Sequence, residues 1–66
     1  MDNNGRRSLA AILQGLVFPA VRWEIVTQAG MYGADAGICD RLRRLPVRRS
    51  YVGVADVAAA LDSLPS

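Results

Sequence analysis

The side chains that most often transfer protons or attack substrates are scarce in this sequence. It has no histidine for general acid–base catalysis and no lysine for a Schiff base, and its eight basic residues are all arginine. Cys39 is the one thiol, and no histidine is present to activate it as a nucleophile. We therefore interpret Cys39 as a small, half-buried apolar residue. The sequence predicts no catalytic residue and no enzymatic activity.

Metal and cofactor sites are not indicated either. A zinc site needs several Cys or His ligands, and the aspartates at 35, 40, 56 and 62 lack the spacing of a calcium loop. The glycine-rich segment 30–37 matches neither the phosphate-binding loop nor the dinucleotide fingerprint. It is better explained as the end of one helix and the start of the next. We expect no metal and no cofactor.

Five arginines are clustered between positions 41 and 49: Arg41, Arg43, Arg44, Arg48 and Arg49. We favour an ordinary solvated helix end, because Asp40 is spaced to pair with Arg43 or Arg44 and arginine suits a helix C-terminus. One alternative is a nucleic-acid site, in which Arg41, Arg44, Arg48 and Arg49 contact phosphates. Another is contact with an acidic protein. The net charge of +2 is too small to identify a nucleic-acid binder.

Tyr51 follows this cluster. We favour a structural role, in which Tyr51 and Pro46 clamp the loop while the hydroxyl finds a polar partner. The alternative is that its ring stacks on an exposed base of a nucleic acid.

Trp23 is the candidate for protein binding, together with Arg22 and Thr27. At 100° per residue, Trp23 falls about 150° from the apolar stripe of its helix, so we expect it to be exposed or half-exposed. Tryptophan is enriched in interface hot spots. Two alternatives are packing within the chain, on the N-terminal tail or Met31, and no role at all.

Four short helices must position these residues. We expect a flexible tail over 1–7 and one domain over 8–66, an all-α compact bundle without strands. The helices are predicted at 9–14 capped by Ser8, 19–31 with Pro19 in the first turn, 35–45 capped by Asp35, and 54–63. Each is too short to be stable alone, so their apolar stripes must pack together. The predicted core is Leu9, Ile12, Leu13, Leu16, Phe18, Val21, Ile25, Ile38, Leu42, Leu45, Val57 and Leu61.

The chain has 66 residues, of which 52% are apolar. A core of this size is marginal, and one cysteine excludes an internal disulfide, so support from a protein partner or self-association is expected. The longest apolar run is 16–21, which contains Pro19 and is too short for a signal peptide or a membrane span. A cytoplasmic location without membrane contact is the simplest interpretation.

Two turn motifs suggest a family. Gly15-Leu-Val-Phe-Pro-Ala, Leu42-x-x-Leu45-Pro46, Tyr51 and Asp56-Val57 resemble the bacterial domain-of-unknown-function family 2795, which is common in actinobacteria. The resemblance covers about residues 9–61 and implies a compact helical fold and no activity. The chain departs from the family pattern in the longer turn after Pro46, which lacks an acidic residue, and in Trp23, where members usually carry a polar residue.

These observations predict a small non-catalytic interaction module, an accessory or regulatory protein that binds another protein. The alternative function is a small nucleic-acid-binding regulator that uses the arginines between 41 and 49.

Overall fold

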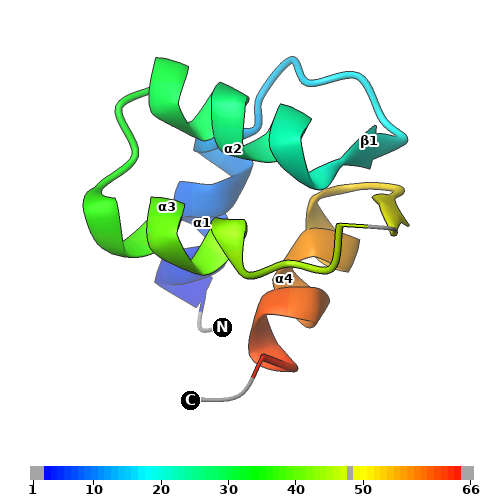
Figure 1. The fold of residues 1–66 in the computed structure, drawn as a ribbon. Coiled ribbons are helices and arrows are strands. Elements are labelled where there is room, and N and C mark those ends of the chain that lie inside the picture. The colour runs from blue at the N-terminus through cyan, green and yellow to red at the C-terminus, as the bar shows by residue number, and fades with distance from the viewer. Residues whose placement is uncertain (1–2, 48, 65–66) are drawn as a thin grey trace.

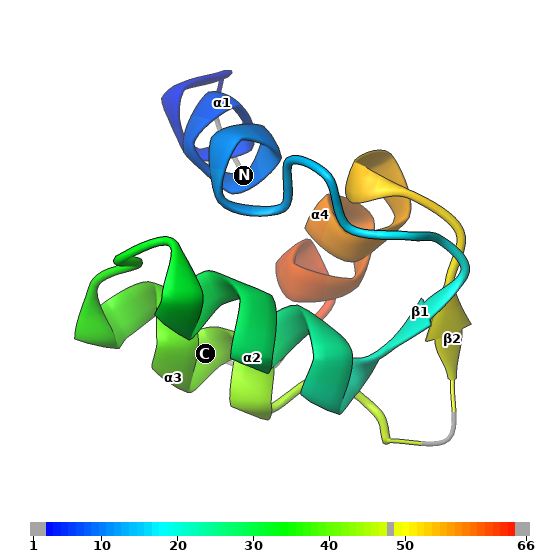
Figure 2. The same ribbon diagram turned by 90° about the horizontal axis from the view of Figure 1, so that it is seen from above.

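A computed structural model describes residues 3–47 and 49–64 as four helices and two very short strands. In chain order the elements are α1 (Asn3–Ile12), β1 (Ala20–Val21), α2 (Arg22–Met31), α3 (Ala36–Arg43), β2 (Ser50–Tyr51) and α4 (Val54–Asp62). Helices α2 and α3 run antiparallel side by side, and α1 packs against α4 next to this pair (Figures 1 and 2). The mostly helical fold is as predicted.

The strands are a correction to the all-α prediction. β1 and β2 pair antiparallel, with Ala20 opposite Tyr51 and Val21 opposite Ser50. Two residues per strand are too few to display the alternating pattern by which a strand is recognised in a sequence. The pairing connects the segment before α2 with the segment before α4 by backbone hydrogen bonds. It lies at the end of the molecule away from the α2–α3 turn (Figure 1).

Helix α1 begins earlier than predicted. It starts at Asn3, so residues 3–7 are helical rather than a tail, and Ser8 lies inside the helix instead of capping it. Residues 1 and 2 of the predicted tail lie outside the described residues. Leu9 and Ile12 are buried on the inner side of α1, and packing against α4 supports the additional turn.

Helix α2 begins later than predicted, at Arg22 rather than near Pro19. The reason is the pairing of β1, which holds Val21 extended with ψ at 168°. The backbone N–H of Val21 donates to the Glu24 carboxylate at 3.1 Å, which is one half of a capping box. At the other end Gly33 adopts a φ of 73°, and the N–H of Ala34 donates to the carbonyl of Ala29 at 3.0 Å. This arrangement is a Schellman motif.

Asp35 caps α3 as predicted, because its carboxylate accepts a hydrogen bond from the N–H of Ile38 at 2.8 Å. The helix ends at Arg43, two residues earlier than expected, but Leu45 is still buried. Helix α4 starts at Val54 as predicted and ends one residue early, at Asp62.

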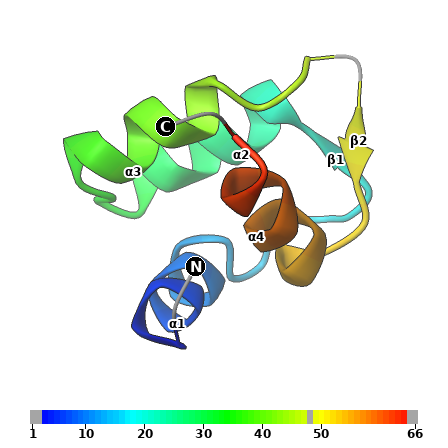
Figure 3. The ribbon, with the colours of Figure 1, turned by 90° about the horizontal axis from the view of Figure 1, so that it is seen from below.

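The core lies between the α2–α3 pair and helices α1 and α4. Figure 3 shows the arrangement of these helices from below. Of the predicted core, Leu16, Phe18, Val21 and Ile38 are half-buried, and the other eight residues are buried. The structure adds five buried residues to this core: Ala20, Ala29, Tyr51, Ala58 and Ala60. Within the described residues, no helix combines the length and apolarity needed to cross a bilayer.

Candidate functional site

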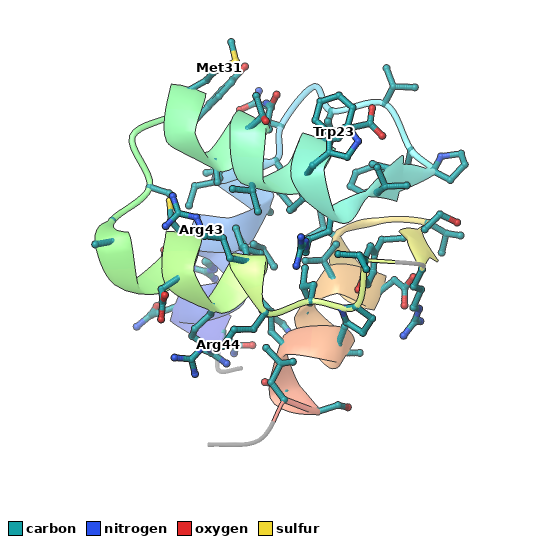
Figure 4. All side chains as sticks on the ribbon, viewed as in Figure 1. Trp23, Met31, Arg43 and Arg44 are labelled. Atoms are coloured by element: carbon teal, nitrogen blue, oxygen red, sulfur yellow. The ribbon has the colours of Figure 1, made fainter. Side chains whose placement is uncertain are left out.

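Trp23 lies on the solvent side of α2. Ile25 and Ala29 on the inner side of this helix are fully buried, whereas Trp23 is 67% exposed. Thr27 and Met31 follow at intervals of four residues and are also exposed, Met31 at 75%. Trp23 and Met31 project from the side of α2 away from α3 (Figure 4). The prediction of an exposed Trp23 is confirmed, and packing of the indole inside the fold is not observed.

Arg22 has an internal role that the sequence did not reveal. Its Nη1 donates to the carbonyl oxygen of Arg43 at 2.7 Å, and the residue is half-buried. Arg43 is the last residue of α3, so this bond satisfies a carbonyl that has no partner in its own helix. Of the three protein-binding candidates, Trp23 and Thr27 are therefore presented to solvent, while Arg22 joins α2 to α3.

The arginines between 41 and 49 are largely engaged within the chain. Arg41 donates to the carbonyl of Leu61 at 3.4 Å, and Arg44 pairs with Asp40 at 3.1 Å, as predicted for an ordinary helix end. Arg49 pairs with Asp56. Arg48 lies outside the described residues. Arg43 and Arg44 are seen at the surface of the α3 end in Figure 4.

Tyr51 has no exposed surface, and its hydroxyl donates to the carbonyl of Pro46 at 3.4 Å. The predicted clamp of the loop is confirmed. The guanidinium of Arg49 lies 5.3 Å from the centre of the ring, a cation–π arrangement. A ring without an exposed face has no room for a nucleobase. The base-stacking alternative for Tyr51 is therefore wrong.

Asp56 is the residue that sequence reasoning missed. One of its carboxylate oxygens accepts a hydrogen bond from Arg49, and the other accepts from the N–H of Val52 at 3.2 Å. Asp56 is in the first turn of α4, where a carboxylate is also favoured by the helix dipole. Its position three residues after Gly53, the N-cap of α4, could have indicated a role at the start of this helix. The pairing with Arg49 could not be predicted, because it depends on the path of the loop. Arg49, Tyr51 and Asp56 thus form one loop clamp.

Burial of Tyr51 predicts a loss of stability at alkaline pH. Burial raises the pKa of the Tyr51 hydroxyl above its ordinary value of 10.0; the Arg49 guanidinium opposes this shift and the Asp56 carboxylate reinforces it. The folded state therefore keeps the proton to a higher pH than the unfolded state. The resulting stability is complete below about pH 10 and is lost as the pH rises through the raised pKa. Urea unfolding over a pH series should show this loss in the wild type.

The control for this pH dependence is Tyr51→Phe, which keeps the ring but removes the titrating group. We expect the variant to be less stable than the wild type at neutral pH and to lose less stability above pH 10. Equal slopes in both proteins would show that Tyr51 is not the responsible group.

Cys39 is half-buried as predicted, with its Sγ 3.8 Å from the carbonyl oxygen of Ala34. The part of the chain that the structure describes contains no cluster of three or more His, Cys, Asp or Glu side chains that could hold a metal ion.

The fold and these surfaces define a small helical domain in which several polar side chains stabilise loops and helix ends, and which presents an exposed tryptophan on one helix. The chain belongs to the family described as "Protein of unknown function (DUF2795)", whose model matches residues 5–58. The predicted membership of this family is thereby confirmed. No curated protein and no solved structure matches the chain significantly.

Proposed function

We propose that this protein is a non-catalytic interaction module that binds another protein through the exposed side of α2, as an accessory or regulatory cytoplasmic protein. The observation that carries the proposal is the position of Trp23. A large aromatic side chain, 67% exposed, stands on a rigid helix whose opposite side is anchored in the core. Tryptophans in such positions are enriched among the residues that dominate binding energy.

The neighbouring residues support the same surface. Thr27 and Met31 extend it along α2, and Met31 adds a flexible apolar side chain that adapts to different partners. The two charged residues of α2 are at its N-terminal end, where Arg22 and Glu24 have internal hydrogen-bond partners. The rest of the exposed side is uncharged, as expected for the centre of a protein–protein contact.

The nucleic-acid function is the weaker candidate. Three of its four arginines, Arg41, Arg44 and Arg49, already donate to groups within the chain, and Tyr51 is buried. Titration of the labelled protein with duplex and single-stranded DNA, at low and at physiological salt, tests this alternative. Salt-sensitive amide shifts on residues 41–51 would favour it over the α2 surface, because phosphate contacts depend steeply on salt.

Replacement of Trp23 is the direct test of protein binding. Proteins retained by the immobilised wild type would be identified, purified and titrated against the chain, with Trp23, its only tryptophan, as a fluorescent reporter. We expect Trp23→Ala to weaken binding at least about 30-fold, the effect of losing a hot spot of about 2 kcal/mol. Binding should persist at high salt.

Val47→Ala is the matched control, since Val47 is 59% exposed and lies outside α2. It should bind like the wild type. A partner that binds Trp23→Ala as tightly as the wild type would contradict the proposed surface.

A further inference from the structure

A groove lies between α1 and α4, away from the Trp23 side of α2. It has a volume of about 400 Å³, within the range of ligand sites. The lining residues are Asn3, Arg6, Arg7 and Ala10 from α1 and Val54, Ala55 and Ala58 from α4. The alanines leave space where the two helices meet. The groove therefore combines a small apolar surface with two guanidinium groups.

The charge of this groove differs from that of the arginine-rich region between 41 and 49. Arg41, Arg44 and Arg49 donate to groups within the chain. Within the described residues, by contrast, the side chains of Arg6 and Arg7 make no hydrogen bond or ion pair, and no carboxylate lines the groove. Asp62 of α4 interacts with Arg6 at longer range and has a partner of its own.

We propose that this groove binds an acidic amphipathic segment of a partner protein. Carboxylates of the segment would pair with Arg6 and Arg7, and its apolar side chains would enter the space beside Ala55 and Ala58. Arginine suits this role because its planar guanidinium donates two parallel hydrogen bonds to a carboxylate. Opposite charge on the two surfaces also excludes basic competitors.

An acidic peptide fits this groove better than a nucleic acid does. Nucleic-acid binding draws its affinity from many phosphate contacts along a strand. Two adjacent arginines beside alanine and valine side chains offer few such contacts, whereas an apolar floor with a basic edge matches one side of an amphipathic helix. The groove is separate from the α2 surface, so an experiment can contradict one of the two proposed binding sites without contradicting the other.

The test is a titration of the isotope-labelled full chain with a synthetic helical peptide that carries glutamate along one edge of a leucine face. We expect amide shifts on residues 3–10 and 54–58. The same peptide with glutamine in place of glutamate should bind about tenfold more weakly, which is the combined effect of two exposed ion pairs. Duplex DNA at the same ionic strength serves as the competitor.

Three variants complete the test. Arg6→Gln combined with Arg7→Gln should weaken binding about tenfold. Ala55→Gln, which fills the groove without changing its charge, should also weaken it. Arg43→Gln is the matched control, since Arg43 is an exposed arginine on α3 outside the groove, and it should bind like the wild type.

The proposal is overturned if the glutamate peptide causes no amide shifts on the groove residues. It is also overturned if the glutamine peptide binds the wild type as tightly as the glutamate peptide does, or if the double variant binds the glutamate peptide as tightly as the wild type does. It is equally overturned if DNA shifts the groove residues and displaces the peptide. Circular dichroism of each variant establishes that it is folded. None of these outcomes changes the expected effect of Trp23→Ala, which concerns the other side of the molecule.

Discussion

Tyr51→Ala is expected to reduce the free energy of unfolding by about 3–5 kcal/mol, the cost of deleting a fully buried aromatic ring. The ring lies under Arg49, its hydroxyl reaches Pro46, and its backbone pairs with Ala20. A domain of this length has a total stability of about 3–10 kcal/mol. The variant is therefore expected to be unfolded or nearly so in water. Urea unfolding followed by circular dichroism measures the difference.

Val52→Ala is the control for Tyr51→Ala, because Val52 is the next residue and its side chain is 75% exposed. We expect a change within about 0.5 kcal/mol. A similar loss in both variants would mean that the loop, rather than the buried ring, determines the stability. A small loss in both would contradict the place of Tyr51 in the core.

Ile25→Ala is expected to cost about 2–5 kcal/mol, whereas Trp23→Ala, in the same helix, should change the stability by no more than about 0.5 kcal/mol. Ile25 is fully buried against the rest of the core and Trp23 is 67% exposed. The larger side chain is therefore expected to contribute less to folding. Urea unfolding of the two variants under the same conditions tests this order.

The comparison of these two variants also bears on function. A Trp23→Ala protein that folds as well as the wild type but loses its partner separates binding from folding. If Trp23→Ala is as destabilising as Ile25→Ala, the indole is part of the core and the proposed contact surface on α2 is wrong.

Two separate surfaces follow from the distribution of side chains. The uncharged outer side of α2 and the basic groove between α1 and α4 are formed by different helices. The binding experiments on Trp23 and on Arg6 with Arg7 measure each surface independently.

Much of this fold was determined by local sequence alone. The apolar spacing predicted four helices, Asp35 predicted the start of α3, and the position of Trp23 opposite Ile25 and Ala29 predicted its exposure. These features depend on residues three to four positions apart, whose relative directions are set by the helix itself. The Asp40–Arg44 pair was foreseeable for the same reason.

The remaining features were decided by tertiary structure. Because β1 pairs with β2, α2 starts later than predicted. Because α1 packs against α4, α1 starts earlier than predicted, at Asn3. Arg22 and Arg41 donate to carbonyl groups about twenty residues away in the sequence. The packing of α1 beside α4 places Arg6 and Arg7 at the groove. Local propensity contains no information about such contacts, because they form only when helices far apart in the sequence are packed together.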